Sequence, residues 1–211
     1  MSHVNGRINI AFGVPAYRSQ VHIGQVRMWL QLGAAIMADA GMYLSAFIDM
    51  DCCGVDKARN YLIAHAMKEG ADWLLMVDSD TWCANGRVLL EMIRGADLVG
   101  ASVVGAPVYR RVDGMMALNA YRFDGTKLVS AKLNGEGLEE VAAIGAAVMA
   151  VNLHKIAEST MFRFTDELSE DLDFCKQIHQ LGGTIWCDSR VKTFHAKSDV
   201  MVYDPELAVV R

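Results

Sequence analysis

The sequence predicts an α/β protein whose central sheet is mostly parallel and is flanked by helices. Strand patterns and helix patterns alternate through the first hundred residues, which is typical of such a sheet. The run from Leu74 to Val77 is wholly apolar, which indicates a strand covered on both faces. The chain has 211 residues, is 53% hydrophobic and contains only three prolines, so it can bury one sizeable core. We therefore expect a single domain over residues 1–211.

The first half of the chain supplies the expected parallel strands and their covering helices. Apolar runs predict strands at residues 8–13, 43–48, 72–77 and 97–103. Apolar positions that recur near the helical period predict helices at residues 23–40, 56–68 and 87–94. Asp56 is expected to cap the second of these helices, and Gly70 follows its end. In sheets of this kind ligands bind beyond the carboxyl ends of the strands, so we expect the functional site there.

The second half of the chain has a different pattern, which predicts antiparallel or mixed strands. Asp124-Gly125 lies between two short strand patterns at 121–123 and 127–131, a strong signal for a hairpin. An apolar run at 141–151 predicts a further strand, after which Asn152 is expected to cap a short helix. Ser169 is expected to cap another helix, whose first turn is acidic. A last short strand is predicted at 184–187, and residues 188–211 show no period.

Composition excludes several classes of protein. The net charge of −5 removes the simplest electrostatic case for nonspecific binding to nucleic acid. The longest apolar run, 141–151, is far shorter than the ~20 residues of a membrane-spanning helix, and the N-terminus is a poor match to a secretory signal. The sequence therefore predicts a cytoplasmic protein. Its five cysteines lack CxxC spacing, which argues against a disulfide framework and a zinc cluster.

Two carboxylates stand directly after the apolar strand, in Asp78 and Asp80. With their carboxylates roughly 5 Å apart, their repulsion is about 3 kcal/mol at an effective dielectric constant of about 20. A positive group is therefore expected between or beside them. One interpretation is a helix-capping turn in which Asp80 or Asn85 accepts from backbone amides. The other is a site for Mg²⁺ or Mn²⁺, which prefer hard oxygen ligands and share them with substrate phosphates.

Further motifs decide between these interpretations. "VDSD" after an apolar strand is followed about ninety residues later by "SEDLDFCKQIHQLGGTIWCDSRVKTFH". This order resembles inverting GT-A-fold glycosyltransferases of the compact phage or bacterial type, which carry Asp-x-Asp, then Glu-Asp-x-Asp, then a C-terminal histidine. "VPAY" and "DKARN" fit the nucleotide half of that fold. The resemblance implies a single GT-A-like, Rossmann-type domain, with a nucleotide-sugar-binding half at 1–103 and an acceptor-side half, ending in a flexible segment, at 104–211.

The resemblance implies a metal site and a catalytic base. Asp80 would ligate Mn²⁺ or Mg²⁺, Asp78 would share the metal or contact the ribose, and His195 would be the third ligand. Asp171 would be the general base that deprotonates the acceptor hydroxyl, and Glu170 would bind the acceptor. Taken alone, acids at the start of a helix are explained by the helix dipole, worth about 0.3–1 kcal/mol.

Two neighbouring acids, Asp166 and Glu167, lie about one helical turn from Asp171, so the identity of the base stays open among them. An ordinary exposed histidine remains the alternative interpretation of His195.

Donor contacts are expected from several segments at the strand ends. Arg59 and Asn60 lie in the first turn of the second helix, where backbone amides and the dipole favour an anion. An ordinary surface role for Arg59 stays open. Tyr17 is a candidate for stacking on the nucleobase. The remaining candidates for contacts to the base, ribose or donor sugar are Pro15, Asp49, Asp51, Tyr109 and Arg110.

The expected activity is transfer of a sugar from a UDP- or GDP-sugar to an acceptor hydroxyl, with inversion. Haloacid-dehalogenase-type phosphatases also use Asp-x-Asp, but there the motif lies in the first strand. Sugar nucleotidyltransferases share the architecture and the metal, yet "FGVPAYRSQ" lacks their glycine-rich loop. A non-catalytic nucleotide-sugar-binding module is a third alternative. The acceptor stays open between a glycan, a protein and a hydroxymethylated base in DNA, against which the acidic net charge counts.

Overall fold

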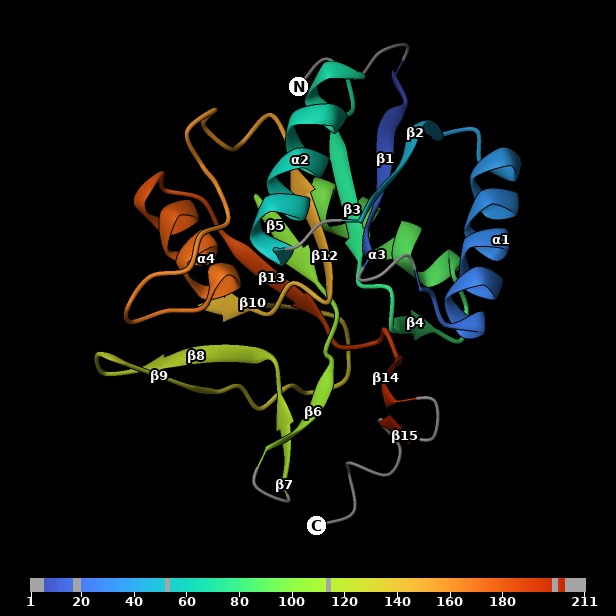
Figure 1. Ribbon diagram of the computed structural model, residues 1–211. Helices are drawn as coiled ribbons and strands as arrows, with labels where there is room; N and C mark the ends of the chain where they lie inside the picture. Colours follow the sequence, from blue (N-terminus) through green and yellow to red (C-terminus); the bar gives the residue numbers. More distant parts are fainter. Residues whose placement is uncertain (1–5, 17–19, 52–53, 113–114, 199–200, 204–211) are drawn as a thin grey trace.

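The computed structural model describes residues 6–16, 20–51, 54–112, 115–198 and 201–203. Its centre is a seven-stranded sheet with the order β10-β13-β5-β12-β3-β1-β2 (Figure 1). In chain order these strands are β1 (Ile8–Ala16), β2 (Met42–Asp51), β3 (Trp73–Val77), β5 (Val103–Gly105), β10 (Leu138–Val141), β12 (Val148–Asn152) and β13 (Ile185–Asp188). The predicted α/β architecture with helices beside a large sheet is therefore confirmed.

Four helices cover the sheet, and β3 shows how the two faces differ. The helices are α1 (Ile23–Ala38), α2 (Val55–Lys68), α3 (Arg87–Leu98) and α4 (Glu170–Gln180). Leu74 and Met76 pack in one core with residues of α2 and α4. Trp73, Leu75 and Val77 pack in the other core with residues of α1 and α3. All five side chains are fully buried, as expected of a strand covered on both faces.

The direction of the strands departs from the prediction of a mostly parallel sheet. The pairs β1–β2, β1–β3 and β5–β13 are parallel, while β12 runs antiparallel to both of its neighbours and β10 antiparallel to β13. Over all sheets of the described residues, three pairings are parallel and eight are antiparallel. The sheet is therefore mixed. Between β5 and β12 the chain forms hairpins and no covering helix, so β12 enters the sheet reversed.

Three small sheets lie below the main one in Figure 1. The first has the order β11-β8-β9, with β8 (Ala120–Asp124) and β9 (Lys127–Ser130) joined by the predicted hairpin at Asp124-Gly125, and β11 (Ala143–Ile144). The second pairs β6 (Tyr109–Val112) with β7 (Met115–Leu118). The third has the order β15-β14-β4, built from β4 (Thr81–Cys83), β14 (Thr193–Ser198) and β15 (Met201–Tyr203).

Several predicted element boundaries are wrong, each because a long-range contact outweighs a local pattern. The strand expected at 97–103 starts only at Val103, because α3 continues to Leu98 and Asp97 accepts a hydrogen bond from Trp73 Nε1 at 3.2 Å. The apolar run at 141–151 is divided among three strands that belong to two sheets. Asn152 ends β12, and its Oδ1 accepts from the His154 amide at 3.1 Å in a turn. The stretch after residue 188, predicted to be irregular, contains β14 and β15.

The cysteines and the helices of the structure bear on two predictions from composition. Cys83, Cys175 and Cys187 are buried and free, whereas Cys52 and Cys53 lie outside the described residues. Burial raises the pKa of the Cys83 and Cys175 thiols to about 12, so neither is a nucleophile near neutral pH. None of the helices in the described ranges has both the length and the apolar character that crossing a bilayer requires.

Two glycines give a matched test of this packing. A Cβ added to Gly105, in β5, would lie 2.7 Å from Ile144 Cδ1 and 2.8 Å from the Val148 carbonyl oxygen, whereas a Cβ at Gly33, in α1, meets nothing within 4 Å. We expect Gly105→Ala to lower the free energy of unfolding by about 1–3 kcal/mol. Gly33→Ala should raise it by about 0.5–1 kcal/mol, since alanine favours the helix. Urea unfolding measures both, and a neutral Gly105→Ala would contradict the close packing.

Candidate functional site

A cleft of about 180 Å³ lies at the carboxyl end of β3. Asp78 follows that strand directly, and its amide donates to the Ala147 carbonyl at 2.9 Å, just before β12 begins. The cleft is lined by Arg59, Asp78, Val108, Asn119, Tyr121, Gly145, Ala146, Ala147, Glu170, Asp171 and His195. Five of these are residues that the sequence predicted for the site: the arginine of α2, the first acid after β3, both acids of α4 and the histidine of β14. The fold thus brings together side chains that are up to 136 residues apart in the chain.

Arg59 is the buried centre of this cluster, with only 3% of its surface exposed. Its Nη2 donates to both carboxylate oxygens of Asp78, at 2.9 and 3.1 Å, and its Nη1 donates to Glu170 Oε1. The guanidinium lies 5.5 Å from the ring centroid of Phe162. Burial lowers the pKa of Arg59, but the two carboxylates outweigh it, and the pKa is raised overall. The predicted phosphate contact of Arg59 stays a prediction, and the structure gives its guanidinium two carboxylate partners.

Burial also shifts the pKa values of the two acids that Arg59 binds. Burial raises the pKa of Asp78 and of Glu170 above the ordinary values for these groups, and Arg59 opposes the rise in both. Neighbouring acids add to the rise, Asp80 in the first case and Asp171 in the second. A positive group beside the acids after β3 was expected from their repulsion, and Arg59 is that group in the structure.

Asp80 and His195 form a second pair beside this cluster, of which His195 lines the cleft and Asp80 does not. His195 Nε2 lies 3.3 Å from Asp80 Oδ2, and this contact is the largest cause that raises the pKa of His195, against the effect of burial. The pair is held by backbone: His195 is the ladder partner of Thr81 in the β4–β14 pairing, and the Ala196 amide donates to the Asp80 carbonyl at 2.9 Å. The predicted convergence of the third strand and the C-terminal histidine is therefore present.

The donor atoms at this place fit a hard divalent cation in part. Asp80 supplies a carboxylate that is half exposed and His195 an imidazole that is largely buried. Both oxygens of Asp78 accept from Arg59, and no group of three or more His, Cys, Asp or Glu that could hold a metal is found within the described residues. Two protein ligands suit Mg²⁺ or Mn²⁺, since Mg²⁺ usually keeps several waters and takes one or two carboxylates plus substrate phosphates.

Asp171 occupies the position expected of a base at the start of α4. Ser169 is at the N-cap position, as predicted, but its side chain makes no capping hydrogen bond to a backbone amide. Its hydroxyl instead donates to Asp171 Oδ1, as does the Leu172 amide at 2.9 Å. The other oxygen, Oδ2, lies beside Gly145 at the cleft wall, 3.2 Å from where a Cβ on that glycine would stand. One oxygen is thus fixed by the helix start, and the second borders the cleft. Asp166 and Glu167 are exposed and do not line the cleft.

Other predicted donor contacts lie elsewhere. The side-chain amide of Asn60 binds the backbone of Phe162. Its Nδ2 donates to the Phe162 carbonyl at 2.8 Å, and its Oδ1 accepts from the Phe162 backbone amide at 2.7 Å. It holds the loop before α4 against α2, which is a structural role. Pro15 is buried in β1 beside Met50, and Tyr109 packs half-buried against the core, so neither lines the cleft.

The structure does not describe the side chains of three donor candidates, Tyr17, Asp51 and Arg110. Tyr17 lies outside the described residues. The described backbone includes Asp51 and Arg110 in strands, but not their side chains. Asp49 is exposed on β2.

Sequence reasoning missed the wall formed by the hairpins. Asn119 is buried, its Oδ1 accepts from the Val108 amide at 2.7 Å, and its Nδ2 donates to the Gly145 carbonyl at 3.2 Å. It thereby joins the start of β6 to the turn before β12. Tyr121, two residues further along β8, also lines the cleft. A single asparagine within an otherwise apolar stretch was the available signal, because buried polar side chains require hydrogen-bond partners.

Comparison with known proteins identifies the fold but no family. No protein-family model and no curated protein matches the sequence. Among solved structures, the chain is similar to the one described as "Crystal Structure of A197 from STIV", with a TM-score of 0.63 and 14% sequence identity, over 94% of this chain and 91% of that one. At this identity the similarity concerns the fold alone.

The Arg59 cluster predicts a pH-dependent stability change. A carboxyl group whose pKa is raised on folding stabilises the fold below its unfolded pKa and loses that contribution as pH rises through the folded pKa. Removing Arg59 takes away the cation that opposes the rise in Asp78 and Glu170. Arg59→Met should therefore lower the free energy of unfolding by about 3 kcal/mol at pH 8, and by less at pH 5, where both acids can bind protons.

Urea unfolding at both pH values measures this effect. Arg87→Met is the matched control, since Arg87 is exposed and lies 3.5 Å from an exposed Glu91. Its loss should cost less than about 1 kcal/mol at either pH. An Arg59→Met loss that is equal at pH 5 and pH 8 would contradict the proposed source of the instability.

Proposed function

We propose that this protein is a metal-dependent glycosyltransferase of the GT-A type, which transfers a sugar from a nucleotide-diphosphate sugar to an acceptor hydroxyl with inversion. The observation that carries the proposal is the single cleft in which Asp78, Glu170, Asp171 and His195 meet. The sequence motifs predict each of these four positions. They come from the end of β3, the start of α4 and strand β14.

The residues in and beside the cleft have the chemistry that the separate parts of this reaction require. Asp80 and His195 would hold Mn²⁺ or Mg²⁺, which when bound neutralises charge on the diphosphate leaving group. Asp171, with Oδ2 at the cleft wall, would accept the proton of the acceptor hydroxyl, a contribution of roughly 10²–10⁴ in rate. Arg59 binds both Asp78 and Glu170, so it ties the loop after β3 to the start of α4, where Asp171 lies. Inversion needs no further nucleophile from the protein.

The charge of the cleft favours a neutral acceptor. Its described lining contains three carboxylates, from Asp78, Glu170 and Asp171, against one arginine and one histidine. A phosphate-rich polymer would be repelled from such a wall, whereas a sugar hydroxyl would be accepted. We therefore place a glycan acceptor first and a hydroxymethylated base in DNA second. A nucleotidyltransferase would instead consume a sugar phosphate and a nucleoside triphosphate and release pyrophosphate, so pyrophosphate release from that pair of substrates tests this alternative.

Removal of the cation ligand should abolish turnover. Wild-type protein is incubated with a panel of UDP- and GDP-sugars and Mn²⁺ or Mg²⁺, and release of the nucleoside diphosphate is measured. We expect turnover of a UDP- or GDP-sugar that EDTA stops and that Asp80→Ala lowers at least about 100-fold, because the leaving group loses its neutralising charge. Glu158→Ala, a change at an exposed acid outside the cleft, is the control. The absence of metal-dependent turnover with every donor would contradict the proposal.

Removal of the base should separate transfer from donor binding. Asp171→Asn keeps the shape of the side chain and the bond to the Leu172 amide but removes its basicity. We expect transfer to an acceptor to fall about 10²–10⁴-fold, while the dissociation constant for UDP or GDP, measured by calorimetry, changes little. Unchanged transfer would move the base to Glu170, Asp166 or Glu167, each tested by the same substitution to the amide.

A further inference from the structure

Three aromatic rings form a continuous stack beside the Asp80–His195 pair. The imidazole of His22 lies on the indole of Trp82, with ring centroids 4.0 Å apart and an interplanar angle of 8°. Trp82 in turn stacks with Phe194, at 5.8 Å and 16°. The rings come from three separate places in the chain: the residue before α1, strand β4 and strand β14. None of the three was assigned a role in the proposed reaction.

Two rings of the stack belong to β4, which Asp80 directly precedes, and to β14, which carries His195. Trp82 and Phe194 are ladder partners in the antiparallel β4–β14 pairing. Trp82 stands two residues after Asp80, and Phe194 directly precedes His195. A strand advances about 3.3 Å per residue, so a slip of one register would carry His195 Nε2 well beyond its 3.3 Å distance from Asp80 Oδ2. A ladder of only three residue pairs needs another contact to hold that register.

His22 supplies this contact, because it is itself fixed on both sides. Its amide donates to the Ser79 carbonyl at 3.0 Å, between the two acids that follow β3. Its Nδ1 accepts from the Gly24 amide at 3.0 Å, which caps α1. The backbone of α1 also lies against the indole, since a Cβ on Gly24 would stand 2.6 Å from the Trp82 ring. Trp82 is thus enclosed by His22, Gly24 and Phe194.

We propose that His22 and Trp82 are positioning residues for the divalent cation: their stack sets the separation of Asp80 and His195, and with it the affinity of this chain for Mn²⁺ or Mg²⁺. The proposal rests on the proposed function, in which those two residues hold the cation. It adds that affinity depends on rings that do not touch the ion. Outer-shell residues that orient metal ligands through hydrogen bonds typically change affinity about 10–100-fold when they are removed, and we expect an effect in this range for the stack.

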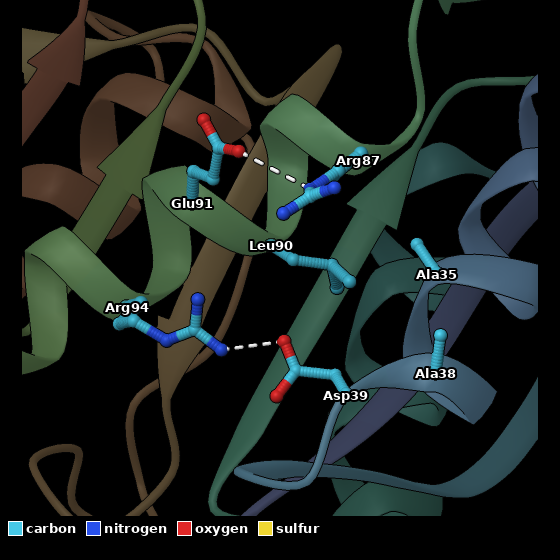
Figure 2. A pocket seen from close by; sticks show the side chains of 7 residues that line it. All are labelled: Ala35, Ala38, Asp39, Arg87, Leu90, Glu91 and Arg94. Atoms are coloured by element: carbon cyan, nitrogen blue, oxygen red, sulfur yellow. Dashed lines mark hydrogen bonds and ion pairs between the residues drawn. The ribbon is translucent and has the colours of Figure 1, made fainter.

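The opposite end of α1 offers a control that leaves the stack intact. There Asp39, the C-cap residue, is bound by Arg94 of α3 at 2.6 Å. Figure 2 shows this ion pair across a small pocket of about 110 Å³ between α1 and α3. Asp39→Asn weakens the contact between the C-terminal end of α1 and α3. A substitution in the stack instead weakens the contact between the N-terminal end of α1 and β4.

The test measures binding of Mn²⁺ alone, by the electron paramagnetic resonance signal of the free ion, so that it does not depend on turnover. Trp82→Leu should weaken binding at least about tenfold, and Trp82→Phe, which keeps a ring in the stack, should restore it to within about threefold of wild type. His22→Asn retains an N-cap acceptor but loses the ring, and should also weaken binding. Asp39→Asn should bind Mn²⁺ as wild type does, even though it lowers the urea midpoint.

The outcomes separate this proposal from the proposed function. If wild type binds Mn²⁺ and Asp80→Ala does not, but Trp82→Leu and His22→Asn bind as tightly as wild type, the positioning role is overturned while the cation site stands. If wild type binds no Mn²⁺, both are overturned. If circular dichroism shows that Trp82→Leu does not fold, His22→Asn and Trp82→Phe are compared with wild type instead. Equal Mn²⁺ affinity of His22→Asn and wild type would then overturn the proposal.

Discussion

The buried guanidinium of Arg59 is the interaction on which the candidate site depends. It joins Asp78, at the end of the central strand β3, to Glu170, at the start of α4. These acids are 92 residues apart in the chain, and both line the cleft. Without the cation, their burial and their acidic neighbours would oppose their approach. A single charged side chain therefore joins the loop after β3, which carries Asp80, to the start of α4, which carries Asp171.

The reversal of β12 has a comparable effect on the shape of the site. Because β12 runs antiparallel between β3 and β5, the turn that precedes it comes to lie at the carboxyl end of β3, beside Asp78. That turn brings Gly145 to Asp171 and links through Asn119 to the start of β6. A purely parallel sheet would have placed a helix connection there. The hairpin sheet instead forms a wall of small and polar groups next to the proposed base.

The acids of the site are easier to predict from the sequence than the segments that bring them together. Asp78 and Asp80 are predicted because they directly follow an apolar strand, whereas Glu170 and Asp171 are predicted through the resemblance of the Glu-Asp-x-Asp motif. His195 was found through its order in the motif, while the strand that carries it was predicted to be irregular. β14 has no independent period of its own; it exists because it pairs with β4, 112 residues earlier. The side-chain amide of Asn60 binds the backbone of a distant loop, a contact that no local pattern indicates.

The sequence by itself determined the alternation of strands and helices, the burial of β3 on both faces and the candidate acids, because these depend on residues close together in the chain. Only the tertiary structure decided that Arg59 bridges two acids, that β12 runs backwards and that His195 reaches Asp80. The physical reason is that each of these rests on contacts between residues far apart in sequence, whose electrostatic and packing energies outweigh local preference. A periodicity records which face of an element is buried, and the folded chain determines what it is buried against.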